Sequence, residues 1–425
     1  MVIPLHKKGT TASVKHFRPV VLTPHEVKIM ERVLRKILME HLEQHALINN
    51  NQHGFRKNRN CATQLLSQLN FILSNSVEGH EVDSIYIDFA KAFDKVDHGL
   101  LLRKLNHYGI RGNFLNWIEN FLKGRTQTVF VNNHSSYSTS VTSGVPQGSV
   151  LGPPLFVVYS DDLSFLVDSQ SQSFSFADDT KLISKISSLS DKLKLQQNLN
   201  SIIQWSHLNN MQLNRDKFEL LCFNFGSNKS NKILLNELPF QNDLNSYLAS
   251  EVIIEPSSTV RDLGVFMDKE LNWSSHYNTI CRQAKKMCGW IFSTIYSRNK
   301  DILLVLFSSL VRSKLEYCCE VWSPHLKKDI VLLEQIQRSF TSRISGQQDV
   351  DYWQRLKNLK ISSLQRRREM LIILHVWKIK NKIYPNSVGF TFSLKNRNSS
   401  AKAVLKPMPK VRGKLLTRYE ESFLI

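Results

Sequence analysis

The chain has 425 residues, of which 42% are hydrophobic and 22% charged, so a globular protein of two or three domains is expected rather than a disordered chain. Its formal net charge is +20, and residues 351–425 alone carry +13, from 17 Lys and Arg against 4 Asp and Glu. This basic excess favours a polyanionic partner, either nucleic acid or an anionic membrane surface. A solvated basic tail is the simpler alternative.

Nothing in the sequence indicates export or membrane insertion. Residues 1–8 lack the apolar core of a signal peptide, and the apolar stretch at residues 302–311 is too short to span a bilayer. The six cysteines include no Cys-x-x-Cys pair, so a zinc knuckle is unsupported and reduced thiols are expected. We therefore expect an intracellular protein whose partner is nucleic acid and not a membrane.

The spacing of apolar residues predicts the helices and strands along the chain. Alternation of apolar and polar residues predicts strands that end near Asp88 and near Asp178, and a further strand over residues 218–223. Helices are expected over residues 26–45, 193–213, 303–311, 330–344 and 356–382. The helix over 193–213 should cover the back of the sheet, and residues 393–414 form a tail of low hydrophobicity.

Asp88 closes the first of these strands. Ile85, Ile87 and Phe89 alternate with Tyr86 and Asp88, which is the period of a β-strand. A bare carboxylate at the end of a hydrophobic strand is unfavourable, so a functional role is favoured over the alternative of a cap for the following helix.

Two adjacent carboxylates, Asp178 and Asp179, lie between two short apolar runs, where they should form the tip of a β-hairpin. An acidic pair alone is usually a solvated turn, and a second pair, Asp161–Asp162, is expected to end a helix or cap the next element. Three carboxylates that converge from neighbouring strand ends repel one another unless cations lie between them. Two Mg²⁺ ions about 3.5–4 Å apart form such a centre in nucleotidyl transfer.

Several short segments surround these aspartates in a fixed order: VIPLHKKG at 2–9, FRPVVL at 17–22, QHGFRK at 52–57, residues 86–98, SGVPQGSVLGP at 143–153, FADD at 176–179, MQLNRDK at 211–217 and LGV at 263–265. The series resembles the reverse transcriptases of non-LTR (LINE-type) retrotransposons, and most closely those of the jockey-like group. The likeness spans nearly the whole chain, and the ordered series is far more specific than any one segment.

The resemblance implies an RNA-directed DNA polymerase that uses two Mg²⁺ ions, an RNA template, a DNA primer or target, and deoxynucleoside triphosphates. It implies that Asp88 and Asp178 bridge both ions and that Asp179 is a supporting carboxylate. One ion would generate the nucleophile from the primer 3′-hydroxyl, and the other would neutralise charge on the triphosphate and the departing pyrophosphate.

Phe93 and Gln147 are the candidates for contacts with the nucleotide. The resemblance places the Phe93 ring beneath the sugar, where it would collide with a ribose 2′-hydroxyl; the alternative is a residue that faces the core. Gln147 could hydrogen-bond the template or the incoming nucleotide, or simply belong to a loop that enters a helix. The family usually has one proline where this chain has Pro153–Pro154, and the second could bend that helix.

Arg56 and Lys217 are the candidates for contacts with phosphate. The planar fork of Arg56 could grip the triphosphate, although an exposed basic loop is the alternative. Lys217 could protonate the leaving pyrophosphate as a general acid, or be a surface lysine before the next strand.

The resemblance also implies an α+β fold of the right-hand polymerase type. Residues 1–80 would be an N-terminally clipped part of the fingers, 81–265 a palm with an antiparallel sheet and the aspartates, 266–350 a helical thumb-like region, and 351–425 a basic C-terminal region. Family members usually carry an upstream endonuclease domain, which the few residues before the first segment cannot encode. We therefore expect a polymerase fragment of a larger element.

Two other functions remain as alternatives. One is a catalytically inert truncated copy that acts at most as a nucleic-acid-binding protein, and the other is an RNA-templated RNA polymerase, which Phe93 disfavours. A nuclear location is expected because integration needs chromosomal DNA, and the cluster Arg366–Arg368 could serve import or RNA binding. A cytoplasmic location is the alternative.

Overall fold

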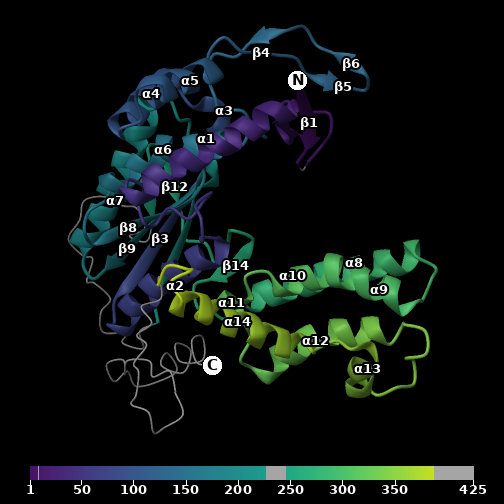
Figure 1. Cartoon of the computed structure of the whole chain (residues 1–425). Helices are drawn as coiled ribbons and strands as arrows, with labels where there is room; N and C mark the ends of the chain where they lie inside the picture. Colours follow the sequence, from purple (N-terminus) through teal and green to yellow (C-terminus); the bar gives the residue numbers. More distant parts are fainter. Residues whose placement is uncertain (8, 226–245, 387–425) are drawn as a thin grey trace, which may run out of the picture. The chain divides into compact units, whose positions relative to one another are not determined.

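The computed structural model describes residues 1–7, 9–225 and 246–386 (Figure 1). The chain divides into two compact units, each assembled from separate stretches of sequence. The first unit comprises residues 1–60, 83–220 and 230–256, and the second comprises residues 61–82, 221–229 and 257–425. The expected segment of low hydrophobicity at 393–414 lies outside the described residues.

A four-stranded sheet is the largest sheet among the described residues, and its strand order is β10–β3–β9–β8. Its strands are β3 (Glu81–Ile87), β8 (Ser171–Phe176), β9 (Asp179–Ile186) and β10 (Glu219–Phe223). Strands β8 and β9 form an antiparallel hairpin in which Phe176 lies opposite Asp179. The predicted strand before Asp88, the predicted hairpin and the predicted strand at 218–223 are therefore confirmed.

Short antiparallel strand pairs make up the other β-structure among the described residues of the first unit. They are β1 (Val2–His6) with β2 (Phe17–Val21), β4 (Thr126–Gln127) with β7 (Thr139–Ser140), β5 (Phe130–Val131) with β6 (His134–Ser135), and β11 (Tyr247–Ala249) with β12 (Val252–Ile254). The central strand β3 is buried along almost its whole length. Its buried carboxylate, Asp83, accepts a hydrogen bond of 2.6 Å from the Tyr247 hydroxyl.

The first unit also contains helices among its described residues. They are α1 (His25–Gln44), α3 (Ala92–Lys95), α4 (His98–His107), α5 (Gly112–Leu122), α6 (Gly152–Ser160) and α7 (Leu189–Leu208), with 3₁₀ turns at Val14–His16, Asp161–Leu166 and Arg215–Lys217. Helix α1 matches the helix predicted over 26–45. Helix α7 packs on β9, and its Leu195, Leu199 and Ile202 are fully buried, as expected for the helix that covers the sheet.

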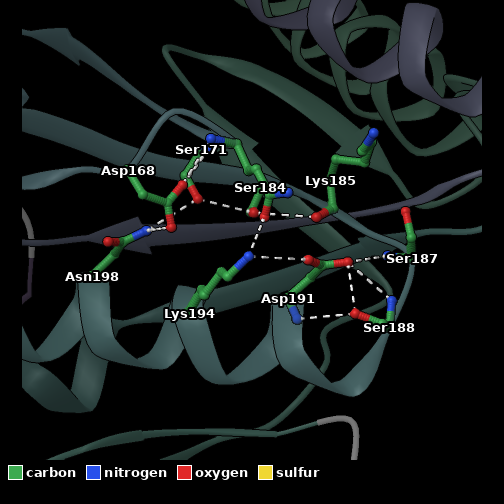
Figure 2. A network of polar contacts seen from close by, with 10 residues as sticks. Asp168, Ser171, Ser184, Lys185, Ser187, Ser188, Asp191, Lys194 and Asn198 are labelled. Carbon is green, nitrogen blue, oxygen red and sulfur yellow. Dashed lines mark hydrogen bonds and ion pairs between the residues drawn. The ribbon is translucent and has the colours of Figure 1, made fainter.

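Polar contacts fix helix α7 to the end of the β8–β9 hairpin that lies away from its tip (Figure 2). Asp191 and Ser188 form a reciprocal capping box at the start of the helix, which satisfies amides that have no partner within the helix. Asn198 donates to Asp168 (3.0 Å) and to Ser171 (3.1 Å) at the start of β8. The base of the hairpin is therefore held rigidly on the helix.

The second unit is mainly helical. It contains the hairpin of β13 (Thr259–Asp262) and β14 (Val265–Asp268), and the helices α2 (Cys61–Val77), α8 (Ser274–Thr294), α9 (Lys300–Leu306), α10 (Ser313–Glu316), α11 (Cys319–Trp322), α12 (Lys327–Thr341), α13 (Tyr352–Leu359) and α14 (Leu364–Lys380). Its core includes Phe340, whose ring packs against those of Phe292 (4.8 Å) and Phe307 (4.7 Å).

Three helix predictions fall in this unit. The helix at 303–311 is observed as α9, which continues through a π-helical stretch (Phe307–Arg312) into α10, and the helix at 330–344 is observed as α12. The helical segment predicted over 356–382 is confirmed except for a break, because α13 ends at Leu359, its C-cap Lys360 is left-handed (φ +54°), and Ser363 caps a new helix, α14.

The division into units does not follow the predicted boundary at residue 80, because α2 clusters with the second unit. The names fingers, palm and thumb and their residue limits stay predictions. Within the described parts of the chain, no helix is both long and apolar enough to cross a membrane.

Candidate active site

The tip of the β8–β9 hairpin carries Asp178. The antiparallel register leaves Ala177 and Asp178 as a two-residue turn between Phe176 and Asp179. Ala177 adopts φ +59°, a conformation that residues with a side chain rarely take. Asp178 is half-buried in this turn, whereas Asp179 begins β9 and is exposed.

Asp88 follows β3, the neighbour of β9 in the sheet. Its backbone is fixed by the segment after α7, because the Asn214 amide donates to the Asp88 carbonyl (2.8 Å) and Phe89 bridges Leu213. The alternative reading of Asp88 as a helix cap is not what the structure shows. The residue at the cap of α3 is Lys91, and the Asp88 side chain instead accepts a hydrogen bond from Lys217.

Asp88 and Asp178 interact electrostatically. Burial raises the pKa of Asp178 above its usual value, and the negative charge of Asp88 raises this pKa further. The positive charges of Arg18 and Lys7 act on Asp178 in the opposite direction. Two of the three predicted aspartates therefore flank neighbouring strands of the sheet and are close enough for their charges to interact.

Among the residues that the structure describes, no three His, Cys, Asp or Glu side chains are grouped so that they could hold a metal ion. The predicted arrangement in which Asp179 completes a three-carboxylate centre is therefore not seen, and Asp88 with Asp178 is the pair that can be considered as a metal ligand set.

Lys217 lies beside Asp88. Its Nζ atom is 3.0 Å from Asp88 Oδ2, and its side chain is 59% exposed. The ammonium group is therefore held beside the carboxylate and remains accessible to a ligand in solvent.

Phe93 belongs to a short aromatic stack. Its ring stacks on the buried Phe156 of α6 at 4.7 Å and meets the edge of Phe55 at 6.2 Å. Phe93 itself is half-buried. One side of the Phe93 ring is therefore fixed by the core, as expected for a core residue. Part of the ring remains available for contact, as expected for a residue that meets the nucleotide.

Gln147 contacts a residue that the sequence did not suggest. Its Nε2 donates to Asp94 Oδ1 at 2.8 Å, and its backbone carbonyl accepts from the Val21 amide at 2.7 Å. Burial raises the pKa of Asp94, and the hydrogen bond from Gln147 opposes that rise. At Gly148 (φ +114°) a Cβ would lie 2.6 Å from the Val21 carbonyl oxygen, so only glycine fits this turn.

The pair Pro153–Pro154 lies at the start of helix α6. Both prolines fall in the first turn of α6, where the amide groups have no partner within the helix. The buried Glu31 of α1 accepts hydrogen bonds from the amides of Val150 (2.6 Å) and Leu151 (2.9 Å) just before this turn. Neither proline therefore removes a hydrogen bond from within the helix.

Arg56 is placed differently from the prediction. Its side chain is 3% exposed, and its guanidinium forms a bidentate pair with Glu43 of α1, with both N–O distances at 2.7 Å. It also donates to the carbonyl groups of Asn49 (2.6 Å) and Gln52 (3.2 Å). Because its donors are used inside the protein, Arg56 is not presented to a triphosphate, and the predicted role is corrected to a structural one.

Two basic residues near Asp178 were missed. Lys7 and Arg18 belong to the β1–β2 hairpin and its flank, and their charges reach Asp178. Both lie in segments that carry the family resemblance, so the signal was present in the sequence. Arg18 and Lys7 lie 160 and 171 positions before Asp178 in the sequence, which hid this electrostatic interaction.

Comparison with known proteins gives a consistent assignment. Residues 5–267 match the family model described as reverse transcriptase (RNA-dependent DNA polymerase). The chain is 26% identical over 428 residues to the RNA-directed DNA polymerase from mobile element jockey of Drosophila melanogaster, which covers 97% of this chain and 44% of that protein. It is 24% identical over 350 residues to the probable RNA-directed DNA polymerase from transposon X-element of Drosophila melanogaster, with coverage of 80% and 37%.

The chain thus spans less than half the length of these relatives. Among solved structures, apo telomerase from Candida tropicalis matches with 13% identity and a TM-score of 0.42, over 84% of this chain and 56% of that one. At this level the likeness does not by itself define the fold.

Proposed function

The chain belongs to the reverse transcriptase (RNA-dependent DNA polymerase) family, and from this premise we propose that it copies RNA into DNA by nucleotidyl transfer at Asp88 and Asp178. The α+β architecture agrees with the right-hand polymerase fold of this family. The observation that carries the proposal is the interaction between Asp88 and Asp178, because it joins the ends of two adjoining strands into one acidic centre.

Asp88 and Asp178 fit a divalent cation. A carboxylate whose pKa is raised by burial and by a second carboxylate gains from a positive charge placed between the two. Mg²⁺ is typically held by one or two carboxylates together with substrate phosphates and water, so a third protein carboxylate is not required. When bound, two such ions would lower the pKa of the primer 3′-hydroxyl and neutralise charge on the phosphates. Asp179 is retained as a supporting carboxylate.

Basic side chains would bind the triphosphate from two directions. Lys7 and Arg18 place positive charge near Asp178, and we assign to them the grip on the phosphates that Arg56 does not provide. Lys217 lies 3.0 Å from Asp88, where it can donate a proton to the departing pyrophosphate as a general acid.

Phe93 and Gln147 would select and position the nucleotide. The Phe93 ring, fixed on Phe156, would exclude a ribose 2′-hydroxyl by collision. The hydrogen bond from Gln147 to Asp94 holds the Pro146–Gly148 turn in place, from which the Gln147 amide can reach a base or sugar. An RNA template, a DNA primer or target, and deoxynucleoside triphosphates are the partners proposed for this chain, with a nuclear site of action.

Primer extension on an RNA template, with Mg²⁺ and deoxynucleotides, tests the proposal. The wild type should extend the primer, whereas Asp178→Asn should reduce the rate at least about 100-fold because charge stabilisation in the transition state is lost. Asp162→Asn is the matched control, since Asp162 belongs to an acidic pair that is bound to Lys104. Extension by both Asp178→Asn and the wild type would contradict the assignment. Absence of extension by a folded, RNA-binding wild type would contradict the activity itself.

A further inference from the structure

The turn that carries Asp178 is held in an unfavourable backbone conformation. Ala177, with φ +59°, is neither glycine nor asparagine, the residues that take this conformation most easily. Such conformations persist where the surroundings fix them, and they concentrate at functional sites. The contacts that fix Ala177 therefore also decide where the Asp178 carboxylate lies.

Gln52 makes the most direct of these contacts. Its side chain is buried, with the whole residue 3% exposed. Its Oε1 atom accepts one hydrogen bond from the Ala177 amide (3.2 Å) and another from the Gly54 amide (2.8 Å). A single amide oxygen thus ties the strained turn to a second segment of the chain.

That second segment runs beside the end of β8. The Ser175 amide donates to the Asn51 carbonyl (3.1 Å), and the His53 amide donates to the Ser175 carbonyl (2.9 Å). A Cβ on Gly54 would lie only 2.3 Å from the Ala177 nitrogen, so the two backbones approach as closely as glycine permits. Residues 51–54 therefore form a brace along one side of the hairpin tip.

Arg56 connects this brace to helix α1. It donates to the backbone carbonyls of Asn49 and Gln52, and its other nitrogens bind the Glu43 carboxylate. Bidentate pairs of this kind are well defined, because the fork of donors fixes both distance and angle, and the Arg56 side of this pair is buried. The position of Gln52 is therefore fixed relative to helix α1.

We propose that Gln52 is a positioning residue for Asp178, and that Arg56 holds Gln52 in the place this requires. The inference rests on the proposed function, because Asp178 must carry the reaction for its placement to affect the rate. It gives the Gln52–Arg56 segment a role in the chemical step that does not involve contact with nucleic acid, nucleotide or metal.

The experiment compares Gln52→Met with Gln52→Glu. Methionine has a similar length and removes the acceptor, whereas glutamate keeps an oxygen that can accept both hydrogen bonds. The matched control is Gln64→Met in the second unit, where a fully buried glutamine has no hydrogen-bond partner for either side-chain polar atom within the described parts of the chain. Two readouts are taken: single-nucleotide incorporation on an RNA template, and hydrogen exchange of the backbone over residues 172–182.

Gln52→Met should lower kcat about 10- to 100-fold and leave KM for the deoxynucleotide within about twofold, because displacement of a reacting group affects the chemical step more than binding. It should also speed exchange at the hairpin tip. Compared with Gln52→Met, Gln52→Glu should have a kcat closer to that of the wild type and slower exchange at the hairpin tip. Gln64→Met should have the kcat and the exchange rate of the wild type. The melting temperatures of the variants show whether each is folded.

The inference is overturned if Gln52→Met keeps kcat, if Gln52→Glu behaves like Gln52→Met in both readouts, or if Gln64→Met loses as much activity as Gln52→Met. If the wild type itself is inactive, the proposed function fails, and hydrogen exchange alone decides the inference about placement. Faster exchange at the tip in Gln52→Met then supports the brace, and unchanged exchange contradicts it.

Discussion

The first unit contains two pairs of aspartates, and the surroundings of the two pairs differ. Asp161 accepts hydrogen bonds from the Asn49 amide (2.9 Å) and the Tyr108 hydroxyl (3.2 Å), and Asp162 pairs with Lys104 at 2.9 Å. As expected from the sequence, this pair follows the end of α6 and begins the next turn. Here each carboxylate has fixed partners within the protein, although burial still raises the pKa of Asp161.

Asp88 and Asp178 form the other pair. Asp88 has an exposed lysine beside it, and Asp178 has the more distant charges of Arg18 and Lys7, while the two carboxylates repel each other. The comparison suggests that the first pair stabilises the fold and that the second is arranged to receive charge from a ligand. Changes at the first should alter stability, and changes at the second should alter chemistry.

Substrate selection gives the largest contrast. Phe93→Val removes the ring that would meet a ribose 2′-hydroxyl, so incorporation of ribonucleotides relative to deoxynucleotides should rise about 10- to 100-fold. Tyr108→Phe, which removes the hydroxyl bound to Asp161, should leave the ratio unchanged. Competitive single-nucleotide incorporation measures this ratio, and an unaltered ratio in Phe93→Val would show that Phe93 is only a core residue.

Removal of a positive charge near each pair should affect KM for the deoxynucleotide differently, by about tenfold. Arg18→Ala should raise KM for the deoxynucleotide about 10-fold, since a hydrogen bond between charged groups contributes about 1.5–3 kcal/mol. Lys104→Ala should leave KM unchanged and lower the melting temperature, because it leaves Asp162 without its partner. Steady-state kinetics and thermal unfolding decide the point. If Lys104→Ala raised KM as much as Arg18→Ala does, the proposed difference between the two aspartate pairs would be contradicted.

Stability should show the smallest effect, with opposite signs for the two pairs. Asp178→Asn should increase the free energy of unfolding by about 1 kcal/mol at pH 7, because it removes a carboxylate whose charge is unfavourable in the folded state. The folded-state pKa of Asp178 is raised, so the wild type takes up a proton on acidification before the unfolded chain does. The advantage of the variant should therefore shrink as the pH falls through that pKa.

Asp162→Asn should instead lower the free energy of unfolding by up to about 1 kcal/mol, because it weakens a partly exposed ion pair with Lys104. Denaturant unfolding of both variants at two pH values checks these signs. Destabilisation by Asp178→Asn, or stabilisation by Asp162→Asn, would contradict the comparison.

Much of the site could be predicted because it depends on local sequence patterns. The alternation around Asp88 and the two runs around Asp178 define strands whose ends carry the carboxylates, and the sheet places those strands in neighbouring positions. For Lys217, the sequence left two roles open, a general acid or a surface lysine. Its contact with Asp88 depends on the backbone pairing between Phe89 and Leu213, which no local pattern reveals.

The part that could not be predicted depends on contacts between distant segments. Arg56 reads as an exposed basic residue until its partner Glu43 is seen on a different element, α1. The hydrogen bond from Gln147 to Asp94 joins residues more than 50 positions apart. The break between α13 and α14 was missed because Lys360 takes a left-handed conformation that sequence patterns assign to glycine or asparagine.

Binding of Mn²⁺, followed by electron paramagnetic resonance on the full chain with primer–template and a deoxynucleotide present, tests the central claim most directly. If Asp88 and Asp178 together hold the cation, Asp88→Asn and Asp178→Asn should each weaken Mn²⁺ binding about 10-fold or more, and Asp162→Asn should bind like the wild type. Equal Mn²⁺ affinity in the wild type and both site variants would show that the cation, and with it the reaction centre, lies elsewhere.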